Sequence, residues 1–218
     1  MSLIDELQES AEQDDALTVL RKAKRLSSKL KKQEIMHWVD AELSGYKPSA
    51  DMPAYRISPT TMHYNTNGFI PAGFGRIMNG IQPLPGGIER LEVPIRDPIA
   101  TILDWTKNKD KKAGLYFPVP EESAEVLRSQ LSCNFPQVID QLTFLAKLSD
   151  AVVRAIPDHV KNRVLNWALE LESAGITGEG KSFTKKEQAI ARDITFNING
   201  SNIDQLNNLG NNQKDRYD

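Results

Sequence analysis

Apolar side chains recur every three or four residues over the first 44 residues, which is the spacing of helices with one buried face. Either Asp14 or Asp15 is suited to begin the second of these helices, because a carboxylate accepts hydrogen bonds from the free N–H groups of a first turn. Gly45 stands where a left-handed C-terminal cap would end the third. Three helices are thus predicted, around Leu3–Ala11, Ala16–Leu30 and Gln33–Ser44.

The pattern changes to short stretches of two-residue alternation after residue 46, and this alternation is typical of β-strands. Residues 47–94 are also rich in Pro, Gly, Asn and Thr, which favour turns. We expect a small, irregular antiparallel sheet drawn from about residues 54–95, 114–119 and 141–149, with helices at about 97–107 and 121–131. For residues 141–149, a helix continuing from Val138 is the alternative.

Helical spacing returns in the last third of the chain. A helix is predicted to begin at 150–156, to be interrupted at Pro157–Asp158, and to resume over 159–173. Thr184 and Glu187 form a capping-box pattern that opens a short helix ending near Arg192. The side chains expected to be buried in the helices are Leu20, Val39, Leu43, Val164, Leu165 and Ala168.

These elements predict an α+β fold in which helical N- and C-terminal parts enclose the sheet, followed by a C-terminal β tail. We expect a main domain over residues 1–176 and an extension over 177–218. The extension would hold the short helix, a strand at Ile194–Ile203 and a disordered tail rich in Asn and Gly.

Composition and charge indicate the cellular setting of the protein, but they indicate less about its chemistry. The 218 residues carry a net charge of −2, which gives no general case for nucleic acid or an anionic membrane as partner. A single cysteine rules out an internal disulfide and fits a reducing compartment. The acidic N-terminus is unlike a signal peptide, and no apolar run approaches the length of a membrane span. A cytoplasmic protein without a membrane partner is expected.

Charge is unevenly distributed, because seven of the twelve residues from 21 to 32 are Lys or Arg. On a helix, spacings of four, four and three would place a basic face on one side, and that face could meet an anion or a nucleic acid backbone. A solvated helix face is the alternative. No aromatic residues interleave with these cations, so stacking of single-stranded bases is not supported there. The candidate basic face consists of Arg21, Arg25, Lys29 and Lys32.

Other polar patterns are weaker candidates for a site. Trp38, Glu42 and Tyr46 lie four apart and form either a ligand-facing stripe or, as we favour, a packing stripe. His37, Asp40 and Glu42 do not share one helix face, so no metal site is predicted. The sequence contains no nucleophile elbow or phosphate-binding loop, so catalytic residues stay unknown and no cofactor is expected.

The predicted C-terminal strand has one apolar face, made of Ile194, Phe196 and Ile198, and no later element to cover it. The strand can fold back on its own domain or pair with the same strand of a second copy. We expect it to favour homo-oligomers.

Two segments of the chain resemble the AbiTii domain family of bacterial abortive-infection defence. One is AKRLSSKL at 23–30 followed by WVDAELSGY at 38–46, and the other is VKNRVLNWALELE at 160–172. The SFTKKE stretch at 182–187 and the FNING tail are similar to the C-terminal parts of full-length members, so the resemblance covers most of the chain in order. It implies a phage-defence setting and other defence-system proteins as partners. It implies no reaction and no catalytic residues.

Two hypotheses for the function follow. In the first, which we favour, the protein is a binding or assembly module of a defence system and leaves toxicity to another component. In the second, it is an effector enzyme, a nuclease or a nucleotide-acting toxin, whose site is formed by scattered acidic and basic residues. A pocket holding two or more carboxylates with raised pKa would favour the enzyme.

Overall fold

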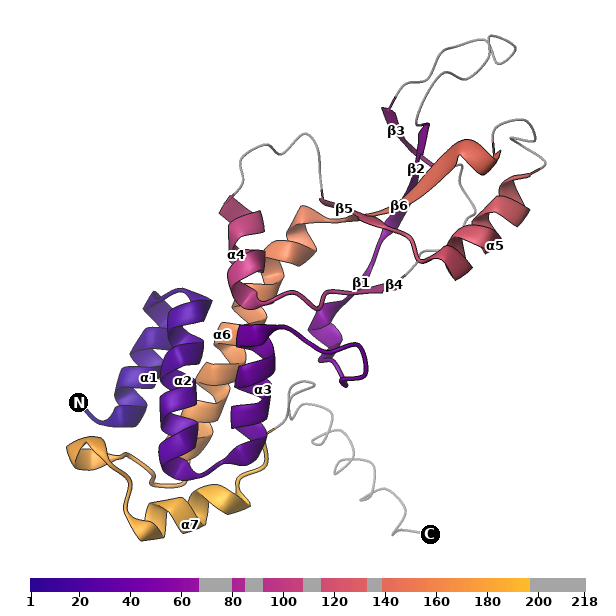
Figure 1. The fold of residues 1–218 in the computed structure, drawn as a ribbon. Coiled ribbons are helices and arrows are strands. Elements are labelled where there is room, and N and C mark those ends of the chain that lie inside the picture. The colour runs from indigo at the N-terminus through magenta and orange to yellow at the C-terminus, as the bar shows by residue number, and fades with distance from the viewer. Residues whose placement is uncertain (67–79, 85–91, 108–114, 133–138, 197–218) are drawn as a thin grey trace, which may run out of the picture. The chain divides into compact units, whose positions relative to one another are not determined.

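The computed structural model describes residues 1–66, 80–84, 92–107, 115–132 and 139–196 (Figure 1). The chain divides into two compact units, each assembled from segments that are distant in sequence. The helical unit consists of Met1–Tyr55, Arg96–Ala100 and Pro157–Asp218, and the sheet unit of Arg56–Ile95 and Thr101–Ile156. The boundary predicted between residues 176 and 177 falls inside the helical unit.

The predicted α+β fold class is confirmed, because helices and two small antiparallel sheets make up the described part of the chain. No helix in these ranges is both long enough and apolar enough to cross a membrane.

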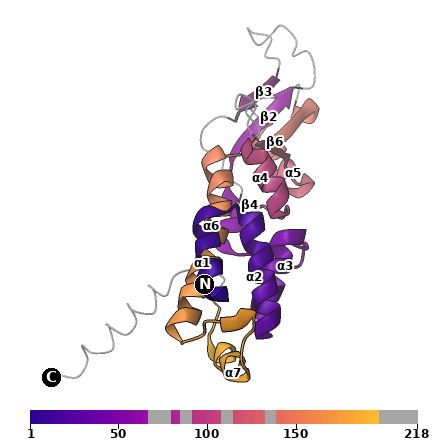
Figure 2. The same ribbon diagram turned by 90° about the vertical axis from the view of Figure 1, so that its left-hand side faces the viewer.

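The helical unit is a bundle in which α2 packs against α1 and α3, with α6 alongside them in both views (Figure 1, Figure 2). Asp15 begins α2, since its Oδ1 accepts from Leu17 N–H at 2.9 Å and Thr18 N–H at 3.0 Å. The short helix α7 lies across one end of the bundle and contacts α2. The bounds are Leu3–Gln13 for α1, Ala16–Leu30 for α2, Gln33–Ser44 for α3, Asp150–Ser173 for α6 and Lys185–Asp193 for α7.

The interruption predicted at Pro157–Asp158 is wrong, because α6 runs through it as one helix. Proline in a helix interior removes a hydrogen bond and costs about 3 kcal/mol. Burial offsets this cost, since a buried Val or Ile side chain contributes about 1.5–3 kcal/mol. Four such side chains continue the apolar stripe across the proline: Val153, Ile156, Val160 and Val164.

The predicted buried positions hold for Leu20, Val39, Val164 and Ala168. Leu43 and Leu165 are only half-buried, which corrects the prediction. On α6 the large side chain that fills the core is instead Trp167. Both leucines lie at the margin of the apolar stripe of their helix. The periodicity of the sequence locates the centre of such a stripe, but its width depends on the neighbouring helices.

The strands lie in the three segments where the sequence predicts them. A two-stranded sheet pairs β1 (Ile57–Pro59) with β4 (Glu92–Pro94). A four-stranded antiparallel sheet has the order β3-β2-β6-β5. Its strands are Gly80–Pro83 for β3, Thr61–Thr66 for β2, Leu142–Leu148 for β6 and Leu115–Pro118 for β5. The assignment of a strand rather than a helix at 141–149 is confirmed.

One face of the four-stranded sheet is covered by α5 (Glu121–Leu131). The side chains of β6 alternate strictly, with Leu142, Phe144, Ala146 and Leu148 buried. At the β5 edge of the same face, the ring of Phe117 meets Trp105 of α4 (Ile99–Lys107) at 5.8 Å between centroids. This face is the core of the sheet unit.

The predicted strand Ile194–Ile203 is absent over residues 194–196, and the remainder of it lies outside the described residues. Helix α7 continues to Asp193, and Ile194 is its C-cap. Phe196 then turns into the helical unit, where its ring packs on Trp38 at 5.1 Å. Over residues 194–196, contact with this core therefore takes the place of a strand.

The predicted capping box of α7 is confirmed, and it extends further than the sequence indicates. Glu187 accepts hydrogen bonds from the N–H groups of Thr177, Gly178 and Thr184 and from the Thr184 hydroxyl, at 2.7–3.0 Å. Burial alone would raise the pKa of Glu187, but the hydrogen bonds from Gly178, Thr184 and Thr177 outweigh it and lower the pKa to about 2.

Glu187→Gln is expected to lower the free energy of unfolding by about 1–2 kcal/mol at neutral pH, because it removes the charge from four hydrogen bonds at a partly exposed site. A carboxyl whose pKa falls on folding stabilises the protein above its unfolded pKa. The difference between wild type and Glu187→Gln should therefore vanish as pH falls from 4.5 to about 2. Urea unfolding at several pH values measures it, with exposed Glu179→Gln as the control. A difference that persists at the lowest pH would contradict the prediction.

Candidate functional site

The candidate basic face is only partly assembled in the structure. Arg21, Arg25 and Lys29 share one side of α2, with the two arginines exposed and Lys29 half-buried. Arg25 lies 3.7 Å from Glu6 of α1. Lys32 does not continue this face, because α2 ends at Leu30.

The end of α2 explains the displacement of Lys32. Lys31 adopts a left-handed conformation with φ of 58°, and its N–H bonds the carbonyls of Ser27 and Ser28. The chain therefore turns before Lys32, a residue that is 9% exposed. Its Nζ donates to the carbonyl of Arg192 at 3.0 Å. Lys32 ties the end of the bundle to α7, and the basic face retains its three residues on α2.

The candidate self-association residues also separate. Phe196 is 7% exposed and contacts Trp38 of its own chain. Ile194 is half-buried beside the end of α7, and Ile198 lies outside the described residues. Self-association through this segment stays a prediction, and Phe196 supports the alternative in which the chain folds back on its own domain.

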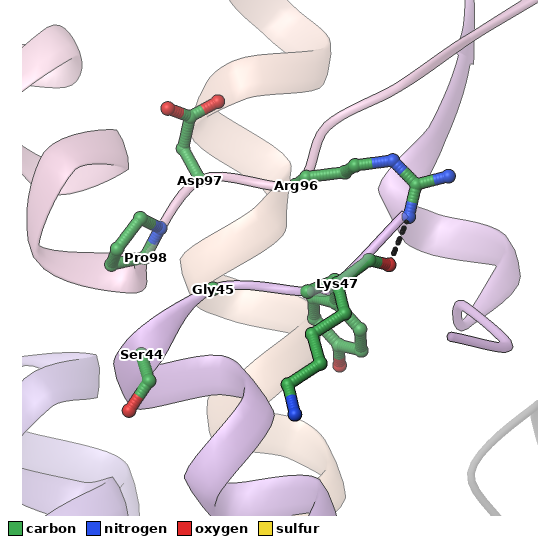
Figure 3. A pocket seen from close by; sticks show the side chains of 7 residues that line it. Ser44, Gly45, Lys47, Arg96, Asp97 and Pro98 are labelled. Carbon is green, nitrogen blue, oxygen red and sulfur yellow. Dashed lines mark hydrogen bonds between the residues drawn. The ribbon is translucent and has the colours of Figure 1, made fainter. Parts of the chain in front are cut away.

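A pocket of about 320 Å³ opens where the end of α3 meets the segment before α4 (Figure 3). The carbonyl of Lys47 accepts from Nη1 of Arg96 at 2.6 Å, and Tyr46 N–H donates to the carbonyl of Arg96 at 2.8 Å. Lys47 is exposed and Arg96 is half-buried. The Lys47 and Asp97 side chains point away from each other. The lining residues are Ser44, Gly45, Tyr46, Lys47, Arg96, Asp97 and Pro98.

Gly45 allows the two segments to approach this closely. Its φ of 89° and ψ of 157° differ from the left-handed cap that the sequence predicts, and belong to a region that is open essentially to glycine alone. A Cβ at this position would lie 2.9 Å from the carbonyl oxygen of Arg96 and 3.3 Å from Pro98 Cδ. The backbone pairing with Arg96, and so the pocket, depends on the missing side chain.

Beneath the pocket, Tyr46 leads to a buried carboxylate. The Tyr46 hydroxyl donates to Oε1 of Glu42 at 2.6 Å, and the Tyr55 hydroxyl donates to the same oxygen at 2.5 Å. Trp38 Nε1 donates in turn to the Tyr55 hydroxyl at 3.1 Å. Glu42 itself is 0% exposed. The predicted preference for a packing stripe over a ligand-facing one agrees with the burial of Trp38, Glu42 and Tyr46.

Two residues of α6 complete what we call the Glu42 cluster. The guanidinium of Arg163 lies 4.9 Å from the centre of the Tyr55 ring, and His159 stacks on that ring at 5.5 Å. A cation over a tyrosine face is stabilised by the ring quadrupole. The Glu42 cluster therefore consists of Trp38, Glu42, Tyr46, Tyr55, His159 and Arg163. Sequence reasoning found the three residues spaced by four but did not connect them to the three from elsewhere, because no spacing signal links the two sets.

The residues considered for a metal are not brought together. Glu42 is buried in its cluster, Asp40 pairs with Lys24 at 2.6 Å, and His37 is exposed. Within the described ranges, no three His, Cys, Asp or Glu side chains gather in a way that could hold a metal ion.

The fold and these sites define an α+β protein with a helical unit, an antiparallel sheet unit and a small pocket over a closed hydrogen-bonded cluster. The family model of AbiTii matches residues 2–196, and the chain belongs to this family. The family name suggests a role in abortive-infection defence. No curated protein and no solved structure matches the chain.

Proposed function

We propose that this protein is a component of a bacterial abortive-infection system and that it works by binding a partner rather than by catalysis. Membership of the AbiTii family supports the defence setting. The observation that supports a binding role is that Glu42 is buried and held by hydrogen bonds within the protein. A general acid or base must come within hydrogen-bond reach of its substrate. Glu42 is fully buried, and one of its oxygens accepts from two tyrosines. Its role is to hold the pocket floor in place.

The pocket itself has the character of a recognition site. A rigid floor is provided by Tyr46, whose hydroxyl is fixed by Glu42. Lys47 and Arg96 bring two cations to the pocket, and Pro98 brings an apolar surface. Asp97 adds one carboxylate, which points away from Lys47 and leaves the cations in excess. A few placed polar groups beside an apolar surface are what ligand and peptide sites commonly present. We propose that an acidic group flanked by apolar atoms is bound here.

Protection against phage tests this proposal. In a bacterium that the wild-type protein protects, the double variant Lys47→Ala/Arg96→Ala should lose protection by about tenfold or more while its unfolding midpoint stays near that of wild type. The matched control is Lys185→Ala/Lys186→Ala, which removes two exposed lysines of α7 in the same unit. The control should protect normally, and plating efficiency is the measurement.

Raising the protein level separates binding from catalysis. Occupancy depends on concentration relative to Kd, so about tenfold more of the pocket variant should restore much of the protection. Loss of a catalytic group typically lowers the rate by about 100-fold or more, which tenfold more protein would not restore. Full protection by the pocket variant at the normal level would remove the pocket from the proposal, and a loss that does not respond to protein level would overturn the binding role.

A further inference from the structure

The four-stranded sheet of the sheet unit has a second face that differs sharply from its core. Strand register places on this outer face the residues that alternate with the buried ones. From β2 and β6 these are Thr61, His63, Asn65, Thr143, Leu145 and Lys147, and none of the six is buried. Helix α5 and the Trp105 side chain of α4 both pack on the opposite, core face.

Two aromatic rings and a cation meet on this outer face. The ring of His63 on β2 lies 5.4 Å from the ring of Tyr116 on β5, in an edge-to-face arrangement of 82°. Nζ of Lys147, on the strand between them, lies 5.6 Å from the centre of the Tyr116 ring. The register pairs Tyr116 directly with Lys147. We call these three residues the ring platform.

The side chains of the outer face suit single-stranded nucleic acid as a partner better than they suit a protein. Unpaired bases stack on aromatic rings irrespective of sequence, and a lysine beside the rings meets the phosphate between two bases. At the described outer positions of the four strands there is one lysine and one histidine but no Asp or Glu, so the charge is complementary to a phosphate backbone. Thr61 and Asn65 flank His63 along β2, while Leu145 and Pro83 pair with it on the neighbouring strands, so the surface beside the rings is mixed rather than a continuous apolar patch.

We propose that the ring platform of Tyr116, His63 and Lys147 binds single-stranded DNA or RNA by stacking of bases on the exposed face of the sheet. A duplex is a poor ligand for this surface, because its bases are already stacked and paired. The site shares no residue with the pocket of the helical unit or with the basic face of α2, so it extends the binding role to a second class of ligand.

Fluorescence anisotropy with the full-length protein tests the platform directly. The probes are labelled oligothymidine and oligouridine of about 12 nucleotides, and a duplex of the same length. Both single strands, or one of them, should bind, and the duplex should bind about tenfold more weakly or worse. Tyr116→Ala should weaken binding of the single strand by about tenfold. Tyr116→Phe, which keeps the ring, should stay near wild type. Lys147→Glu provides a second loss variant if Tyr116→Ala proves unstable.

Salt dependence distinguishes the platform from the basic face of α2. Each phosphate neutralised on a single strand contributes a slope of about −0.7, so one lysine predicts a loss of about threefold between about 50 and 200 mM salt. Three cations of α2 would give a loss of about twentyfold. The triple variant Arg21→Glu/Arg25→Glu/Lys29→Glu should leave binding largely intact. No binding of either single strand at tens of micromolar protein, or binding abolished by the α2 variant and kept by Tyr116→Ala, would overturn the proposal.

Discussion

Replacing Glu42 by alanine is expected to lower the free energy of unfolding by about 3–5 kcal/mol. The carboxylate accepts from the hydroxyls of Tyr46 and Tyr55 at 2.6 Å and 2.5 Å. A hydrogen bond to a charged group contributes about 1.5–3 kcal/mol, and a buried donor left without an acceptor adds a desolvation cost. Glu42→Ala removes the acceptor of two hydroxyl groups at once and leaves a cavity at a fully buried position. Chemical denaturation followed by circular dichroism measures the effect.

Exposed Glu34 on the same helix provides the matched control for Glu42. Its exposed carboxylate lies 3.7 Å from Nζ of Lys32, which also donates to the Arg192 carbonyl, so the pair contributes about 0–1 kcal/mol. Glu34→Ala should therefore stay within about 1 kcal/mol of wild type. Tyr55→Phe removes one of the two donors and should fall between the two. Equal stability of the Glu42→Ala and Glu34→Ala variants would show that the cluster does not hold the bundle together.

The elements that the sequence predicts well are those whose burial is decided locally. The alternation of Leu142, Phe144, Ala146 and Leu148 identifies β6, because a strand with one covered face needs every second side chain to be apolar. The helical stripes of α2 and α3 are read in the same way. Caps behave similarly, since Thr184 and Glu187 satisfy each other three residues apart.

The errors arise where a distant contact decides the outcome. Pro157 is a local helix breaker, yet the stripe of apolar residues on both sides keeps α6 continuous. Lys31 ends α2 in a left-handed conformation without glycine, so the spacing that placed Lys32 on the basic face is lost. The alternation around Phe196 predicts a strand, but the Phe196 ring packs instead on Trp38 in the core of the helical unit.

The candidate sites were harder to predict than the fold for the same reason. The Glu42 cluster joins α3 to Tyr55 and to two residues of α6, more than 100 positions later in the chain. The ring platform needs three strands in a known register before His63, Tyr116 and Lys147 become neighbours. The stacking surface that we propose therefore lies in the sheet unit, where the sequence shows only isolated aromatic residues.

The core of the helical unit yields the other large effect that we expect. Trp167 of α6 is 2% exposed, and truncation of a buried tryptophan to alanine costs about 3–5 kcal/mol because the lost transfer energy and the cavity add together. Leu169 is two residues further along the same helix and 45% exposed. Leu169→Ala should change the stability by less than about 0.5 kcal/mol.

Half-buried Leu165 should rank between these two. Leu165→Ala removes a side chain at the edge of the stripe, where the cavity opens to solvent and water can fill it. A cost of about 1–2 kcal/mol is expected, below the range for a fully buried leucine. Urea midpoints of the three variants give the order directly. If Leu169→Ala were as destabilising as Trp167→Ala, α6 would present the opposite side to the bundle, and its apolar stripe would have to be reassigned.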